Sequence, residues 1–97
     1  MILEGIIDSV SEEKKEKIYK LFNEGFSKLD NEMIRTIEVF FSCGLNLSDA
    51  AKELYIHRNT LIYRLDKIEK YTAYDIRNFN NAVLFKVVFF IWKEKNK

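Results

Sequence analysis

The near absence of helix-breaking residues is the feature that most limits what this chain can fold into. Its 97 residues contain no proline, and its only glycines are Gly5, Gly25 and Gly44. Such a chain is expected to form long, uninterrupted helices, because proline and glycine are the residues that most destabilise a helix interior. Apolar residues make up 47% of the chain, enough for one compact core at this length. The sequence therefore predicts a small all-α domain.

Capping residues predict where the first long helix begins and ends. Ser9 and Glu12 have the spacing of a capping box, so a helix is expected to start near residues 9–11 and to run to about Asn23. Gly25 is expected to end it, because glycine readily adopts the left-handed conformation that follows many helices. The residues predicted for its inner face are Ile18, Leu21 and Phe22.

Similar signals bound the next two helices. Asp30 is a suitable N-cap for a helix over about 31–42, and Gly44 lies where a left-handed C-terminal residue belongs. Asn46 then caps a short helix over about 47–55. The residues expected to be buried are Met33, Ile37, Phe40 and Phe41 in the first of these helices and Leu47, Ala50, Ala51 and Leu54 in the second. The two alanines are small, so another helix can cross close to them.

The next helix, over about 58–71, follows the short turn Tyr55-Ile56-His57. Its apolar residues Leu61, Leu65 and Ile68 are spaced four and three apart and therefore share one helical face. His57 is the expected N-cap, and Ile56 with Leu61 occupies hydrophobic-staple positions, which fix the angle at which the chain enters the helix. A three- to four-residue turn between two helices is typical of a helix-turn-helix. Since this turn has no glycine, Tyr55 must take up the bend.

Polar side chains at the start of this helix are of the types that reach base edges and phosphates. Arg58 can bind a guanine edge with two hydrogen bonds or contact a phosphate, and Ser48 can offer its hydroxyl and amide to a phosphate. The residues predicted to contact DNA are Ser48, His57, Arg58, Asn59, Thr60, Ile62, Tyr63, Arg64 and Lys67. Structural alternatives remain open for several of them: pairing with Glu53 or solvent exposure for Arg58, packing for Tyr63, bridging to Glu53 or Glu69 for Arg64, and local capping for Ser48.

The apolar run from Ala82 to Trp92 is the hardest segment to assign. It is rich in β-branched and aromatic residues, which favour strands. A lone strand in an otherwise helical chain would leave its edges unpaired, so we expect a helix, capped by Asn78 or Asn80 and running to about Glu94. Because this helix is apolar nearly all round, one small domain can cover only part of it. The remainder predicts a homodimer contact or packing against a domain outside this chain.

The charge is distributed unevenly along the chain. The formal net charge is only +1. Residues 1–43 carry six basic and nine acidic side chains, whereas residues 78–97 carry four basic and one acidic. This asymmetry is compatible with nucleic-acid binding by the C-terminal part.

The remaining sequence features argue against several classes of protein. Cys43 and His57 are the only residues of their types, so no internal disulfide and no metal site with several such ligands is expected. Nothing indicates a glycine-rich phosphate loop or a pair of catalytic carboxylates, so we predict neither an enzyme nor a cofactor. The apolar lead at residues 1–8 lacks the basic start of a signal peptide, and the run 82–92 is too short to span a bilayer. We therefore expect a cytoplasmic protein without a membrane partner.

The segment 44–69 resembles the C-terminal helix-turn-helix of PucR/CdaR-type bacterial transcription regulators, which include purine-catabolism and sugar-diacid regulators. The resemblance depends mainly on the runs His57-Arg58-Asn59-Thr60-Leu61, Tyr63-Arg64-Leu65, Ile68-Glu69 and Tyr74-Asp75-Ile76-Arg77. The helix pair is also similar to the Fis-type helix-turn-helix. The resemblance implies a four- to five-helix bundle that binds double-stranded operator DNA as a homodimer, with the helix at about 58–71 in the major groove.

The resemblance also divides the chain. It is good over about 29–92, so we expect a helix-turn-helix DNA-binding domain over 29–97, preceded by a helical lead or linker over 1–28. In this family the domain follows a larger effector-sensing part, which 97 residues cannot contain. An effector-sensing domain is therefore expected to be absent from this chain.

One departure from the family pattern keeps a second function open. Ile62 and Asp66 stand where the family usually has basic residues, so two positive charges are missing from the helix at 58–71. Ile62 is suited instead to contact a thymine methyl group. The alternative to sequence-specific DNA binding is a helical interaction or dimerisation module in which the helix-turn-helix is a relict.

Overall fold

Six α-helices and no strand make up the part of the chain that the structure describes. The computed structural model describes residues 2–96, with side chains from residue 5 onward. The helices are α1 (Ile2–Asp8), α2 (Glu12–Phe26), α3 (Asn31–Ser42), α4 (Leu47–Leu54), α5 (Arg58–Thr72) and α6 (Phe79–Lys95). The predicted all-α class is confirmed. The expected four or five helices become six because the N-terminal lead forms a helix of its own.

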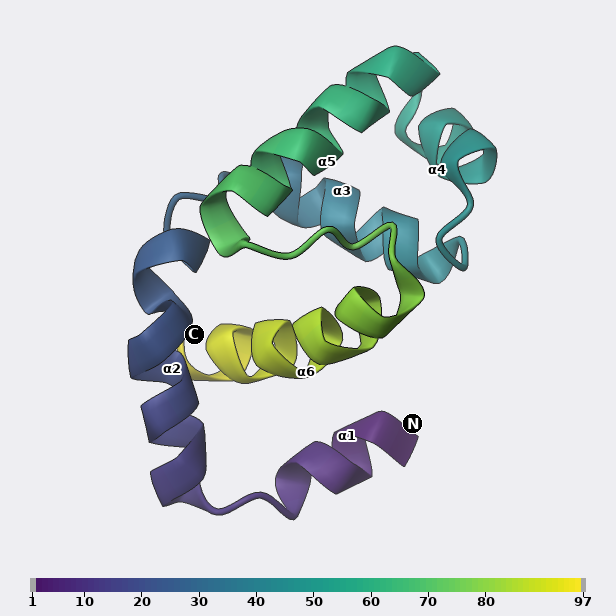
Figure 1. Ribbon diagram of the computed structural model, residues 1–97. Helices are drawn as coiled ribbons and strands as arrows, with labels where there is room; N and C mark the ends of the chain where they lie inside the picture. The colour runs from purple at the N-terminus through teal and green to yellow at the C-terminus, as the bar shows by residue number, and fades with distance from the viewer. Residues whose placement is uncertain (1, 97) are drawn as a thin grey trace.

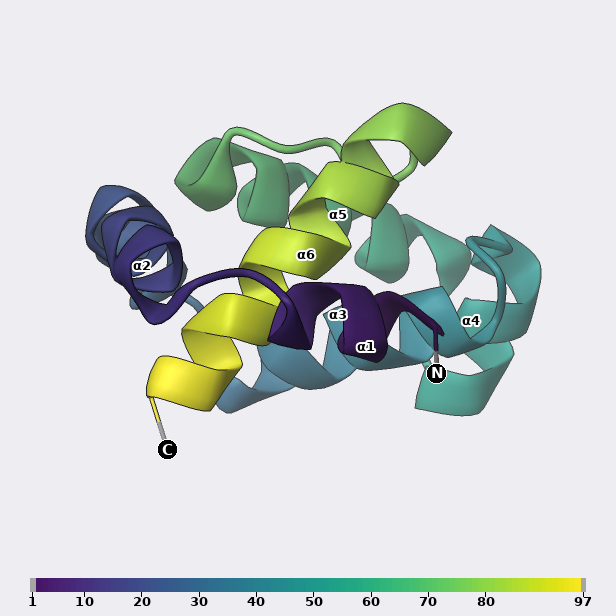
Figure 2. The same ribbon diagram turned by 90° about the horizontal axis from the view of Figure 1, so that it is seen from below.

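The helix-turn-helix pair lies on one side of α6, and α1 lies on the other side of α6 (Figure 1). In Figure 1, α3 and α5 lie above α6, α4 lies beside the upper end of α5, and α2 stands across one end of α6. The view from below in Figure 2 shows α6 crossing the layer that α3 and α5 form. α1 packs against α6. The side chains of residues 1–4, part of the predicted apolar lead, lie outside the described residues.

Side-chain caps fix the start of four helices. Ser11, Asp30, Asn46 and Asn78 are extended, and the side-chain oxygen of each accepts a hydrogen bond of 2.8–3.2 Å from the backbone amide three residues later. Each cap satisfies an amide that has no partner inside its helix. The predicted starts of α3 and α4 are thus confirmed. Asn78 and Asn80 were both candidates for the cap of α6, and the structure shows that Asn78 is the cap. Gly44 has a φ of 64°, as predicted for the residue that follows α3.

Two expectations for α2 are wrong. The helix continues through Gly25 to Phe26. A Cβ at Gly25 would lie 2.2 Å from the carbonyl oxygen of Tyr71, so this glycine lets the end of α5 contact α2 and does not end the helix. Leu21 is 75% exposed and does not belong to the inner face. The inward side at this end of α2 carries Phe22 and Phe26, because residues four apart share a face.

The ring of Phe26 is the centre of an aromatic core. Its centroid lies 5.3 Å from that of Phe85, 6.2 Å from that of Phe89 and 5.7 Å from that of Trp92. The indole Nε1 of Trp92 donates a hydrogen bond of 3.0 Å to Oδ1 of Asn23. Three rings spaced four and three apart can face α2 together only in a helix. The predicted helix is therefore confirmed, and burial of these rings outweighs the β-propensity of the run.

The apolar surface of α6 is largely covered by the neighbouring helices. No helix in the described part of the chain is both long enough and apolar enough to cross a bilayer. On α6 the apolar surface is buried by α2 on one side, and α1 contacts it elsewhere. Ile7 of α1 and Ile91 of α6 are each only 1% exposed.

Candidate functional site

The turn between α4 and α5 is fixed by hydrogen bonds at the end of α4. Tyr55 has a left-handed backbone with φ 57° and ψ 43°. Its amide donates to the carbonyl oxygen of Lys52 at 3.1 Å, and the amide of Ile56 donates to that of Ala51 at 3.0 Å. This is the Schellman pattern of a helix end, where glycine is the usual residue. The expectation that Tyr55 takes up the bend is confirmed.

The apolar face of α5 is fully seated on the neighbouring helices. Leu61, Leu65 and Ile68 are at most 1% exposed. Ala50 and Ala51 of α4 are also buried, as predicted for positions where α5 crosses closely. His57 occupies the N-cap position of α5 in an extended conformation, but its side chain makes no capping hydrogen bond. The buried face fixes which side of α5 points outward.

The outward side of α5 carries most of the residues predicted from the sequence to contact DNA. The exposed ones are His57, Arg58, Asn59, Thr60 and Tyr63 on and before α5, and Ser48 on the first turn of α4. Ile62 is half-buried. Arg58 is exposed and forms no ion pair with any residue that the structure describes, so of its two structural alternatives the structure shows solvent exposure and not the pairing with Glu53.

Lys67 and Tyr63 form a pair on this outward side. The Nζ of Lys67 lies 5.5 Å from the centroid of the Tyr63 ring. The side chain of Tyr63 raises the pKa of Lys67 above its ordinary value, mainly through a hydrogen bond. The ammonium therefore stays charged at neutral pH. Asn59 lies four residues before Tyr63 and shares its face.

Arg64 is held by α3. Its Nη2 lies 3.0 Å from Oε1 of Glu32, and its Nη1 donates to Oγ1 of Thr36 at 3.3 Å. The arginine side chain is only 16% exposed, and Thr36 is fully buried. The sequence offered Glu53 and Glu69 as partners but missed Glu32, because nothing local along the chain indicates which face of α3 meets α5.

Arg77 holds the C-terminal half of α5 to the connector before α6. Its Nε lies 2.6 Å from Oδ1 of Asp75, and its Nη2 lies 2.9 Å from Oδ1 of Asp66 and 3.4 Å from Oε1 of Glu69. Burial raises the pKa of the Asp75 carboxyl, but hydrogen bonds from Arg77 and its charge outweigh this and hold that pKa below its ordinary value. Asp66, the acidic departure from the family pattern, is thus paired with Arg77, which it shares with Glu69 and Asp75.

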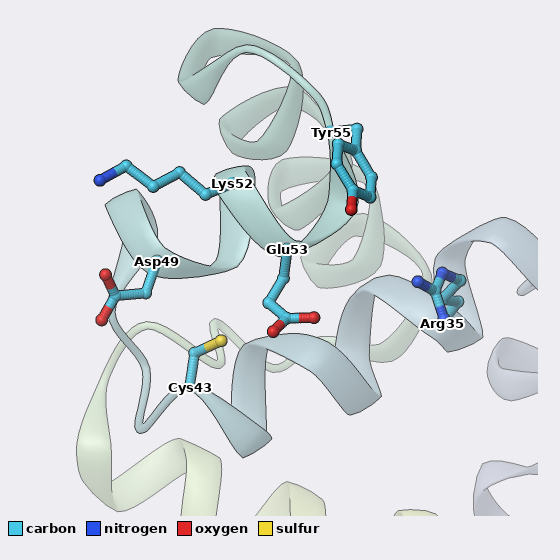
Figure 3. A pocket seen from close by; sticks show the side chains of 6 residues that line it. All are labelled: Arg35, Cys43, Asp49, Lys52, Glu53 and Tyr55. Carbon is cyan, nitrogen blue, oxygen red and sulfur yellow. The ribbon is translucent and has the colours of Figure 1, made fainter.

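An open hollow beside the motif lies between α3 and α4 (Figure 3). It has a volume of about 650 Å³ and is lined by Arg35, Cys43, Asp49, Lys52, Glu53 and Tyr55. Its charges balance, and Lys52 points away from Glu53 in this view. Among the described residues, no group of three His, Cys, Asp or Glu side chains is arranged to hold a metal ion.

The fold and this geometry define a class of domain. α4 and α5, joined by a three-residue turn and seated on α3, form a helix-turn-helix whose second helix presents an exposed polar face. Residues 33–89 match the PucR C-terminal helix-turn-helix domain, and the chain belongs to this family. The resemblance predicted from the sequence is confirmed.

Three relatives illustrate the family. The chain is 36% identical over 76 residues to the uncharacterized protein YxkF of Bacillus subtilis, covering 75% of this chain and 26% of that protein. It is 36% identical over 61 residues to the purine catabolism regulatory protein of B. subtilis, covering 57% and 12%. It is 36% identical over 61 residues to the carbohydrate diacid regulator of Escherichia coli, covering 63% and 16%. The chain thus spans only 12–26% of the length of these relatives. No solved structure gave a significant match.

Proposed function

We propose that this domain binds double-stranded operator DNA sequence-specifically in bacterial transcription regulation, with α5 in the major groove. The observation that carries the proposal is the two-sided character of α5. Its apolar face is buried on α3 and α4, while the first turn, Arg58–Thr60, and Tyr63 are exposed, and Lys67 is half-buried beside the Tyr63 ring. A firmly seated helix with a polar leading end suits the major groove. The names of the purine and carbohydrate diacid regulators among its relatives support this role.

The exposed residues have different proposed roles. Arg58 contacts a guanine edge or a phosphate, and Asn59 and Thr60 contact base edges or the backbone. Tyr63 and Lys67 contact the phosphate backbone further along the groove. Three supporting contacts are proposed at the edges of this surface: Ser48 with a phosphate, His57 at the entrance of the helix, and Ile62 with a thymine methyl group.

We propose that Arg64 acts indirectly. Its guanidinium is already bound to Glu32 and Thr36 and its side chain is only 16% exposed, so turning it toward a phosphate would break both contacts. Its role is then to set the angle of α5 on α3. This leaves Lys52, Arg58 and Lys67 as the main cations beside the groove, which is few for one copy of a DNA-binding domain. Useful affinity therefore requires two copies on two half-sites.

The test is binding to genomic DNA fragments from upstream of the gene's own operon, titrated against salt. Sequence-specific binding predicts that one fragment is retained at moderate salt while a scrambled fragment of equal length is released. The logarithm of the binding constant should fall steeply with the logarithm of salt concentration, in proportion to the phosphates contacted. A relict helix-turn-helix predicts equal, weak binding to both fragments, and that result would overturn the proposal.

A further inference from the structure

Helices α3 and α6 meet through long side chains, which leave a hollow between them. The ring centroid of Phe41 on α3 lies 5.9 Å from that of Phe85 on α6. About two turns further along α6, Nζ of Lys93 lies 2.5 Å from Oε2 of Glu38 on α3. The hollow is open to solvent and has a volume of about 390 Å³. This size is within the usual range for small-molecule pockets, roughly 300–1,000 Å³.

Aromatic rings form much of the wall of this hollow. Phe41, Phe89 and Phe90 all line it. Phe89 is 6% exposed and stacks on the buried Phe85, with 5.4 Å between the ring centroids, so this part of the wall is anchored in the core. Phe41 and Phe90 are half-buried, so each keeps part of its ring surface outside the core. Such a wall favours a ligand that contains a ring, because aromatic rings stack on one another.

The hollow carries one positive charge that no acidic side chain balances. Glu38 and Lys93 both line the hollow and neutralise each other. Lys86 also lines it, is half-buried, and forms no ion pair with any residue that the structure describes. Its Nζ lies 5.8 Å from the centroid of the Phe41 ring. An ammonium group beside an apolar wall attracts an anion more strongly than one surrounded by water on all sides.

The surroundings of Lys86 on its other side also lack an acidic group. Lys86 stands between the hollow and a smaller one of about 210 Å³. The described residues that line this smaller hollow, among them Phe41, Leu45 and Phe79, include no carboxylate. No acidic side chain on either side therefore competes with an external anion for this ammonium group.

We propose that the larger hollow binds a small aromatic monocarboxylate, with its ring against Phe41, Phe89 and Phe90 and its carboxylate on Nζ of Lys86. One unbalanced positive charge matches one carboxylate, and the aromatic wall matches one ring system. The Glu38–Lys93 ion pair crosses from α3 to α6 at this hollow. A long partner helix could not lie along the cleft without displacing this pair, whereas a small molecule leaves it intact. The site lies outside the α5 surface proposed to bind DNA, so the two proposals stand or fail separately.

The first experiment titrates the whole chain, without DNA, with two fluorescent dyes that share one ring system. Anilinonaphthalene sulfonate carries one negative charge, and phenylnaphthylamine is its neutral counterpart. Both should bind at one site per chain, and the anionic dye should bind at least about tenfold more tightly, because only it can form a charge-assisted contact with Lys86. A wild type that binds neither dye saturably, or binds both equally, would overturn the proposal.

The second experiment repeats the titration after substitution of the lysine. Lys86→Met removes the charge and keeps an apolar chain of similar length. It should weaken binding of the anionic dye at least about tenfold and leave that of the neutral dye unchanged. Lys20→Met is the matched control, because Lys20 is exposed on α2 and does not line the hollow. Unchanged binding by Lys86→Met, or an equal loss in Lys20→Met, would contradict a site at Lys86.

A third variant, Ser42→Trp, tests the location by filling the hollow. Ser42 lines the hollow at the end of α3, is exposed, and its hydroxyl donates a hydrogen bond of 2.9 Å to the carbonyl oxygen of Val39 within the same helix. The variant should therefore melt close to the wild type but bind both dyes more weakly. Unchanged affinity for both dyes would place them elsewhere and overturn the proposal.

Competition against the bound anionic dye tests the class of ligand. Naphthoate should displace the dye, whereas naphthamide, which has the same ring system without the charge, should need at least about tenfold higher concentration. Octanoate, an aliphatic acid, should compete less well than naphthoate because it cannot stack on the rings. Equal competition by naphthamide or by octanoate would contradict an aromatic carboxylate as the ligand. Loss of the dye site as the chain concentration rises would show that a second copy of the chain, and not a small molecule, occupies the hollow.

Discussion

Two arginines of α5 show how much the surroundings of a residue decide its role. Arg58 is exposed at the first turn with no ion pair among the described residues, whereas Arg64 is bound to Glu32 and Thr36. From the sequence both are plausible contacts to DNA, since both are basic and lie on one helix. The structure shows different surroundings for the two side chains. Substitution of Arg58 should therefore weaken DNA binding, whereas substitution of Arg64 should lower the stability of the fold.

Arg58→Ala should weaken specific DNA binding by about 1–3 kcal/mol if the side chain reads a base. It should leave the melting temperature almost unchanged, because an exposed side chain without a partner contributes little to folding. Fluorescence anisotropy with the retained fragment and thermal unfolding by circular dichroism measure the two effects. Lys20→Ala on α2 is the control for loss of one exposed charge. Unfolding of the Arg58→Ala variant would show instead that Arg58 is structural.

Arg64→Ala should lower the free energy of unfolding by about 1–2 kcal/mol, because hydrogen bonds to a largely buried guanidinium are lost. The slope of DNA affinity against salt should stay the same, since no phosphate contact is removed. Urea unfolding and a salt titration of DNA binding check the two parts. A slope reduced by about one contact, with unchanged stability, would instead make Arg64 a phosphate ligand.

At the scale of elements, the capping residues explain why the helix boundaries were largely predictable. Asp30 and Asn46 act on amides three residues away, so their effect is visible in a short stretch of sequence. The helical state of α6 was predictable only from the absence of other strands. The end of α2 was not predictable, because the role of Gly25 depends on Tyr71, which is distant in sequence. The Arg64–Glu32 pair on the candidate site escaped prediction for the same reason.

The contact between α2 and α5 can be tested at Gly25. Gly25→Ala should destabilise the domain by about 1–3 kcal/mol, although alanine is the better helix former, because its methyl group would overlap the Tyr71 carbonyl oxygen. Gly5→Ala in α1 is the matched control, since a Cβ there meets nothing within 4 Å. That control should be neutral or slightly stabilising. Chemical unfolding measures the free energy of unfolding of both variants. A Gly25→Ala variant as stable as the control would contradict the close contact between α2 and α5.

At the scale of the whole molecule, ion pairs join segments far apart in the chain. Nζ of Lys95 at the end of α6 lies 2.9 Å from Oε2 of Glu12 and 3.5 Å from Oε2 of Glu16 on α2. Lys15 is 3% exposed, and its Nζ lies 3.4 Å from Oε1 of Glu94. These ion pairs hold α6 to α2. The ion pairs of Arg77 hold the connector before α6 to α5. The fold should therefore depend on ionised carboxylates.

This dependence predicts that the domain loses stability in acid. The hydrogen bond and charge of Lys95 lower the pKa of Glu12, and Arg77 lowers that of Asp75 against the effect of burial. A carboxyl that binds its proton more weakly in the folded state stabilises the fold fully above its unfolded pKa, about 4, and loses that contribution as pH falls through the folded pKa. The melting temperature should therefore be steady from about pH 7 to 5 and fall below about pH 4.

The double variant Glu12→Gln, Asp75→Asn should melt at a lower temperature than the wild type at neutral pH, and its melting temperature should fall less steeply in acid. Glu13→Gln, on the exposed side of α2, should behave like the wild type. Thermal unfolding at each pH, repeated in high salt to screen the exposed pairs, gives the measurement. An acid transition as steep in the double variant as in the wild type would place the responsible carboxylates elsewhere.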